Sequence, residues 1–231
     1  MSNINELVRI DKYTCKFENP VMENRFMGEK YERVKKPISF AIILFTDLRA
    51  YSTITENMSH EVALEFLNEY FTAMHEVIKE FDGHILKYIG DSIMVVFGAP
   101  EKLKNHENQA LNCSLKMIKK LDELNSLWDD NETSRYWKNH GIESITMRIS
   151  IHTGSVIVGN LGSNEMLQYS RIGDTVNVVA RLEQANKEFN TEISFSHDIY
   201  TALKKELYDQ SSLSGEITLK GRGAPTKVYS I

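Results

Sequence analysis

Two apolar runs, each joined to a single aspartate, constrain the fold of this chain more than any other feature. The run from Ile38 to Phe45 predicts a buried strand that ends at Asp47. The run from Ile93 to Phe97 predicts a second strand that begins just after Asp91. Both carboxylates are therefore expected at strand ends. A hard cation such as Mg²⁺ takes few protein oxygens and uses substrate phosphates as further ligands, so a site with two carboxylates suits it.

Composition limits the class of protein. With 231 residues, 42% of them hydrophobic, the chain can bury one substantial core, and we expect an extension over 1–37 and one domain over 38–231. A net charge of -5 argues against nucleic-acid binding, which needs clustered Lys and Arg. The two cysteines, Cys15 and Cys113, are too few for a disulfide framework or a zinc site. This scarcity of cysteines favours the reducing cytoplasm. No run approaches the ~20 apolar residues that span a bilayer, so we expect no membrane segment.

Strand and helix patterns alternate along the chain. Ser59 is a candidate N-cap for a helix that continues to Phe81, and a hairpin over 84–97 is expected to carry Asp91 in its turn. The second half shows a helical pattern over 175–189. The remaining expected elements are a helix over 105–127, a loop over 129–141, strands over 145–152 and 156–161 joined by Thr153 and Gly154, extended segments over 165–172 and 193–195, a short helix over 196–207, and a hairpin over 216–219 and 227–231. Interleaved hairpins and helices predict an α+β fold with a mostly antiparallel sheet.

Four motifs, in order, resemble those of the class III nucleotide cyclase catalytic domain. They are Phe-Thr-Asp-Leu-Arg at 45–49, Lys-Tyr-Ile-Gly-Asp-Ser at 87–92, Ile-His-Thr-Gly at 151–154, and the run from Ile172 to Arg181. The resemblance covers 38–231 and is greatest to bacterial-type adenylyl cyclases. It implies a ferredoxin-like, palm-type sheet flanked by helices.

The resemblance implies a two-metal phosphoryl transfer. Asp47 and Asp91 would hold two Mg²⁺ ions, with Mn²⁺ as a possible substitute, and the Leu48 carbonyl would complete one metal shell. The backbone amides of 49–52 would face the phosphates. In such an enzyme the ribose 3′-hydroxyl of ATP attacks the α-phosphate and pyrophosphate leaves.

Four further residues are assigned to the nucleotide by the same resemblance. Arg181 would stabilise charge on the α-phosphate, because a planar guanidinium suits a fixed cationic donor. Asn177, one helical turn earlier, would orient the ribose. Arg148 and Lys220 would bind the terminal phosphates, and Arg222 is close enough in sequence to replace Lys220.

Base choice would depend on Lys87 and Ser170. The position of Lys87 holds Lys in adenylyl and Glu in guanylyl cyclases of the family, and Ser170 stands where many adenylyl cyclases have Asp and a bacterial-type subgroup has Thr. ATP is therefore favoured over GTP. The hydroxyl subgroup includes members that are stimulated by bicarbonate, so a bicarbonate activator is a further hypothesis. Met166 and Arg171 depart from the family pattern beside this pocket.

The family builds its site between two catalytic domains, and this chain carries both sets of residues. A homodimer with two equivalent sites is therefore expected. Two alternatives stay open: a guanylyl cyclase, and a catalytically silent domain that binds nucleotide or dimerises. Many relatives are fused to sensors, so a regulatory domain outside this chain is also an expectation.

Overall fold

The computed structural model describes residues 39–99, 102–162, 167–172, 174–218 and 225–231, with the backbone alone at 39, 157–162 and 167–172. The predicted extension over 1–37 lies outside these residues. Of the helices within them, none is long and apolar enough to cross a membrane.

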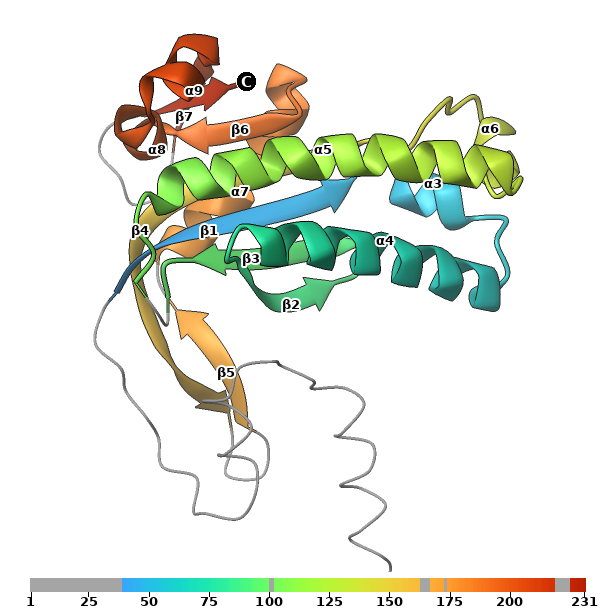
Figure 1. Cartoon of the computed structure of the whole chain (residues 1–231), viewed down its shortest axis with the longest axis horizontal. Helices are drawn as coiled ribbons and strands as arrows, with labels where there is room; N and C mark the ends of the chain where they lie inside the picture. Colours follow the sequence, from blue (N-terminus) through green and yellow to red (C-terminus); the bar gives the residue numbers. More distant parts are fainter. Residues whose placement is uncertain (1–38, 100–101, 163–166, 173, 219–224) are drawn as a thin grey trace, which may run out of the picture. The chain divides into compact units, whose positions relative to one another are not determined.

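A mostly antiparallel sheet organises the described residues (Figure 1). Its strand order is β2-β3-β1-β4-β6-β8-β7, and only the β4–β6 pair within it is parallel. The strands are β1 (Ser39–Leu48), β2 (His84–Ile89), β3 (Ser92–Phe97), β4 (Met147–Gly162), β6 (Ile193–Ser196), β7 (Ser212–Ile217) and β8 (Thr226–Ser230). The far end of β4 pairs instead with β5 (Leu167–Ile172). The predicted α+β fold is confirmed.

Helices cover both faces of the sheet. The long helices α4 (His60–Glu80) and α5 (His106–Asp130) lie together over one face, and α7 (Asp174–Phe189) packs on the other (Figure 1). The shorter helices are α3 (Tyr51–Thr55), α6 (Arg135–Lys138), α8 (His197–Ala202) and α9 (Lys205–Gln210).

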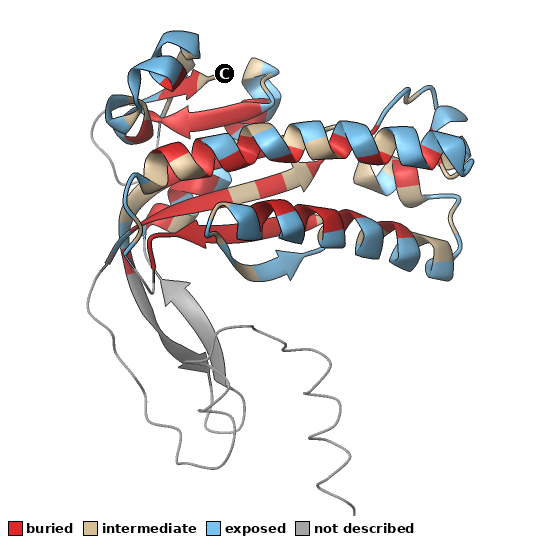
Figure 2. Cartoon of the chain, viewed as in Figure 1, coloured by how far each residue is buried: buried red, intermediate tan, exposed pale blue. Residues whose placement is uncertain are grey.

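The apolar run of β1 is explained by this layering. Successive side chains of a strand point to opposite faces. Ile42 and Leu44 join the core beneath α4 and α5, whereas Ala41 and Ile43 pack with Val179 of α7. Figure 2 shows β1 and β3 as largely buried strands beneath the helices. A strand covered on both faces needs a largely apolar sequence, and Asp47 comes only at its next-to-last position, before buried Leu48.

The predicted helix ends are largely confirmed. The Ser59 hydroxyl accepts a hydrogen bond from the Val62 amide at 3.3 Å, and α4 runs from His60 to Glu80. The hairpin of β2 and β3 places Asp91 in its turn, as predicted.

Three local predictions are wrong. The expected turn at Thr153 and Gly154 does not exist, because β4 continues through it with Gly154 paired to Ala41. A Cβ on Gly154 would collide with the Thr175 hydroxyl, so the glycine permits close approach of α7 to β4. The segment 196–207 forms β6's last residue and two helices, α8 and the start of α9, separated near extended Lys204. The expected loop over 129–141 contains the single-turn helix α6.

Candidate active site

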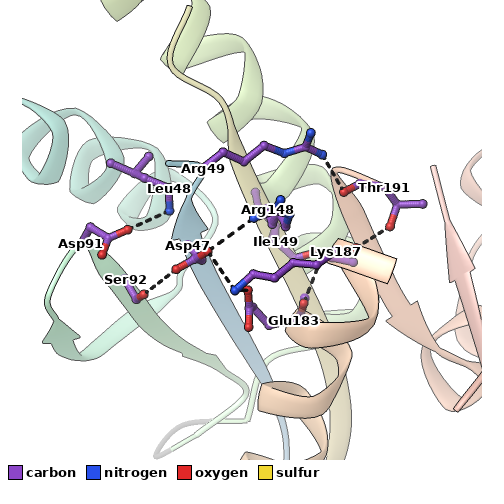
Figure 3. A network of polar contacts seen from close by, with 12 residues as sticks. Asp47, Leu48, Arg49, Asp91, Ser92, Arg148, Ile149, Glu183, Lys187 and Thr191 are labelled. Atoms are coloured by element: carbon purple, nitrogen blue, oxygen red, sulfur yellow. Dashed lines mark hydrogen bonds and ion pairs between the residues drawn. The ribbon is translucent and has the colours of Figure 1, made fainter. Parts of the chain in front are cut away.

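The two predicted metal carboxylates lie close together, at the end of β1 and in the β2–β3 turn. The Leu48 amide donates a hydrogen bond to Asp91 Oδ2 at 3.0 Å, and the Ser92 hydroxyl donates to Asp47 Oδ1 at 3.5 Å (Figure 3). The buried Thr46 hydroxyl adds a third link, because it accepts a hydrogen bond from the Ile93 amide at 3.0 Å. Backbone and side-chain hydrogen bonds therefore hold both acids in place.

Two cations lie beside Asp47. Arg148 is its direct partner in the β1–β4 register, and one guanidinium nitrogen, Nη1, is 3.7 Å from Asp47 Oδ2. Lys187, from the last turn of α7, places its Nζ atom 3.8 Å from the same oxygen (Figure 3). The same Nζ atom lies 2.9 Å from Glu183 Oε1, one helical turn earlier, in an ion pair whose angles do not make a hydrogen bond.

The electrostatics of Asp47 are dominated by burial and by other acids. Burial is the largest cause that raises its pKa, from 3.8 to about 6, and the charges of Glu183 and Asp91 raise it further. The positive charges of Lys187 and Arg148 lower the pKa of Asp47, but they do not offset the increase. Burial, and then the nearby charge of Arg49, lower the pKa of Arg148. Asp47 thus carries a negative charge that the protein alone stabilises poorly.

This donor set fits a hard divalent cation. Carboxylate oxygens are the ligands that Mg²⁺ prefers, and the uncompensated charge on Asp47 would be neutralised by a bound ion. No group of three His, Cys, Asp or Glu side chains with metal-ligand geometry occurs among the described residues. A metal held here would take its other ligands from water, a backbone carbonyl such as that of Leu48, and phosphate oxygens.

Arg49 anchors the segment after Asp47. Its guanidinium donates to the Thr191 carbonyl at 3.2 Å and to Asn190 Oδ1 at 3.4 Å, between α7 and β6. Its backbone amide donates to the Thr146 carbonyl at 2.8 Å. The expectation that the amides of 49–52 all face phosphates is therefore wrong for Arg49.

The residues predicted to bind the base and the ribose make no polar contact with Asp47 or Asp91 within the described part of the chain. Lys87 is exposed on β2, opposite Met94, and Asn177 and Arg181 are exposed on α7. No hydrogen bond or ion pair in the described part of the chain joins these three to Asp47 or Asp91. The backbone of Ser170 pairs with Gly159 in β5 and β4. The Ser170 side chain and all of Lys220 and Arg222 lie outside the described residues, so their roles stay predictions.

Arg181 and Lys187 occupy opposite flanks of one helix. Successive helical residues are rotated by about 100°, and buried Leu182 marks the face of α7 that packs on the sheet. Glu183 and Lys187 then fall about 100° and 140° to one side of Leu182, whereas Arg181 falls about 100° to the other, with Asn177 beyond it. Within one chain, α7 presents Lys187 towards Asp47 and turns Arg181 away.

Sequence reasoning did not identify Ser92, Glu183 or Lys187. Glu183 and Lys187 form an i, i+4 pair with the acid first, which the sequence does show. That pattern usually indicates only a solvated helix face. Its proximity to Asp47 depends on the packing of α7 against β1 and β4, which residue spacing does not reveal.

Together, the fold and this site define an α+β domain that brings two carboxylates and an arginine together at the ends of neighbouring sheet strands. The chain belongs to the family of adenylate and guanylate cyclase catalytic domains, whose model matches residues 34–231.

Individual relatives include both kinds of cyclase. Adenylate cyclase 1 of Rhizobium meliloti (strain 1021) is 34% identical over 188 residues, which make up 81% of this chain and 27% of that protein. The chain thus spans about a quarter of that relative's length. Among solved structures, the guanylyl cyclase Cya2 matches with a TM-score of 0.70 and 28% identity, over 85% of this chain and 93% of that one. The adenylyl cyclase CyaB from P. aeruginosa matches with a TM-score of 0.66 and 27% identity, over 87% and 95%.

Proposed function

We propose that this domain is an adenylyl cyclase that converts ATP to 3′,5′-cyclic AMP and pyrophosphate. The observation that carries the proposal is the grouping of Asp47 and Asp91 at neighbouring strand ends, with Arg148 directly across from Asp47. Two divalent ions bound there would supply Lewis-acid stabilisation to the attacking oxygen and to the leaving pyrophosphate.

The chain's own residues would orient and stabilise the nucleotide. Arg148, fixed on β4 and only 17% exposed, is suited to bind a terminal phosphate at the metal-carboxylate side. Arg181 would place a guanidinium on the α-phosphate oxygens, where charge develops during transfer. Asn177 would hold the ribose so that its 3′-hydroxyl is aligned for attack.

We further propose that each site is shared between two copies of the chain. The two flanks of α7 support this, because Lys187 lies beside Asp47 of its own copy whereas Arg181 is exposed on the other flank. A two-fold dimer would let the Arg181 flank of one copy complete the Asp47 site of the other, twice over. The exposure of Lys87, Asn177 and Arg181 suits residues that act on a ligand across an interface.

Guanylyl cyclase is the second candidate, favoured by the similarity to the guanylyl cyclase Cya2. Lys87 favours adenine, because the two purines present reversed donor and acceptor patterns on the same edge. The hydroxyl expected from Ser170 both donates and accepts, so it discriminates less than a carboxylate would.

The decisive experiment measures cyclic nucleotide formation by the purified chain with ATP or GTP, each with Mg²⁺ and with Mn²⁺. We expect cyclic AMP from the wild-type chain and none from Asp47→Ala. Cyclic GMP as the main product would select the second candidate. No product from a folded dimer under any condition would indicate a silent binding domain. Bicarbonate titration of the same assay tests the activator hypothesis, and a flat response would remove it.

A mixing experiment tests the shared site. Asp47→Ala and Arg181→Ala chains are each expected to be inactive, and their mixture should recover up to about a quarter of wild-type activity, because half of the dimers are mixed and each has one intact site. Mixed dimers that form and stay inactive would contradict the shared arrangement.

A further inference from the structure

Lys187 is an unexpected neighbour for a metal carboxylate. Its ammonium lies 3.8 Å from Asp47 Oδ2, near the place where a divalent ion would have to bind. Its side chain is nevertheless 50% exposed and belongs to a different element, α7. Lys187 is therefore a half-exposed, weakly bound cation beside a carboxylate that we propose as a metal ligand.

We propose that Lys187 is a removable counter-ion of the metal site, which partly offsets the charge of Asp47 when no metal is bound and keeps only its ion pair with Glu183 when a divalent cation is bound. The inference rests on the proposed role of Asp47 as a metal ligand. It adds two positioning residues, Lys187 and Glu183, that set how tightly the site binds its metal.

Lys187, and not Arg148, is the cation that moves. Arg148 is 17% exposed and its backbone is fixed opposite Asp47 by the β1–β4 register. Lys187 reaches Asp47 on a long, flexible, half-exposed side chain, and ion pairs of that kind contribute little stability. A divalent ion competing for Asp47 Oδ2 therefore displaces Lys187 at small cost.

Glu183 gives the displaced ammonium a destination. Its Oε1 atom is already 2.9 Å from Lys187 Nζ, closer than Asp47, and the Glu183 side chain is only 14% exposed. Lys187 can withdraw from Asp47 while it keeps this ion pair. Glu183 also adds negative potential at Asp47, as the largest of the charges that raise the pKa of that carboxyl.

The two residues therefore have opposite predicted effects on metal affinity. Lys187→Gln removes a competing positive charge, and we expect Mn²⁺ to bind about 3- to 10-fold more tightly, the size expected for one partly screened charge several ångströms from a divalent ion. Glu183→Gln leaves Lys187 with Asp47 as its remaining carboxylate partner and lowers the negative potential, so Mn²⁺ should bind about 3- to 10-fold more weakly. The double variant should return close to the wild-type affinity.

The test is a Mn²⁺ titration of the nucleotide-free chain, with free Mn²⁺ followed by electron paramagnetic resonance, so that no turnover is needed. Lys119→Gln, an exposed lysine on α5, is the matched control and should leave the affinity unchanged. Unchanged or weaker binding in Lys187→Gln, or unchanged binding in Glu183→Gln, would overturn the inference.

Asp47→Asn separates this inference from the proposed metal site. Loss of Mn²⁺ binding in Asp47→Asn together with no effect of Lys187→Gln would reject the counter-ion role and keep the site. Full Mn²⁺ binding in Asp47→Asn would instead reject Asp47 as a metal ligand, and the counter-ion role with it. Circular dichroism of each variant confirms that it is folded.

Discussion

Replacing Asp47 with asparagine is expected to stabilise the metal-free protein while it abolishes catalysis. The pKa of Asp47 is raised from 3.8 to about 6 in the folded chain, mainly by burial and next by the charges of Glu183 and Asp91. A shift of about 2 units corresponds to about 3 kcal/mol, since one unit is about 1.4 kcal/mol. Asparagine keeps the shape and removes the charge, so the free energy of unfolding should rise by about 1 to 3 kcal/mol at pH 8.

The sign of the pH dependence follows from the same shift. Between pH 4 and pH 6 the folded wild-type chain binds more protons at Asp47 than the unfolded chain does. The stability that this group contributes is therefore complete below about pH 4 and is lost as the pH rises to about 6. The advantage of Asp47→Asn should be largest at pH 8 and fall to about half at pH 5.

Urea denaturation with a metal chelator present, at pH 8 and at pH 5, measures this advantage. Asp122→Asn, an exposed aspartate on α5, is the control and should change stability by less than about 0.5 kcal/mol. An Asp47→Asn variant that is no more stable than wild type at pH 8, or whose advantage does not fall at pH 5, would refute the reasoning.

Three further predictions concern the core. Phe66→Ala removes a ring that is tilted by 44° against Trp128, with the ring centroids 4.8 Å apart, and should lower the free energy of unfolding by about 3 to 5 kcal/mol in urea denaturation; a loss below about 1 kcal/mol would contradict the packing. Gly154→Ala should cost about 1 to 3 kcal/mol in the same assay, because its Cβ meets the Thr175 hydroxyl, and an unchanged midpoint would exclude that contact. Burial raises the pKa of Cys113 to about 12. In a Cys15→Ser variant, the Cys113 thiol of the folded chain should therefore resist a disulfide reagent at pH 8 and react fully in denaturant. Rapid labelling of the folded chain would disprove the burial of Cys113.

The order of elements could be predicted because their patterns are local. Ser59 marks the start of α4 by a hydrogen bond within four residues, and the apolar run of 93–97 identifies β3 directly. Gly154 misled the prediction for a physical reason. Its small size serves a contact with Thr175, 21 residues later, and a contact of that range leaves no trace in local turn propensity.

In the candidate site, too, local sequence pattern predicts some residues and long-range packing determines the others. Strand ends and motif spacing predict that Asp47 and Asp91 lie near each other, as the structure shows, whereas the phosphate role of Arg148 stays a prediction. Lys187 could not be predicted, because its place beside Asp47 arises only when α7 packs across β1 and β4. Local sequence pattern identifies the candidate site residues, whereas tertiary packing decides which charges surround them.

The anchoring of α7 has a mechanical consequence. The buried Asn186 amide donates to the Ile149 carbonyl at 3.0 Å and to the Ser150 hydroxyl at 3.1 Å, which pins the helix to β4 one residue from Lys187 and one from Arg148. Because a helix turns as a rigid rod, any roll of α7 that carries Lys187 away from Asp47 must also swing Arg181 on the other flank. In the proposed dimer, a rotation of α7 would couple the position of Lys187 beside Asp47 in one site to the position of Arg181 at the α-phosphate in the other site. The hydrogen bonds of Asn186 would be the fixed point of that rotation.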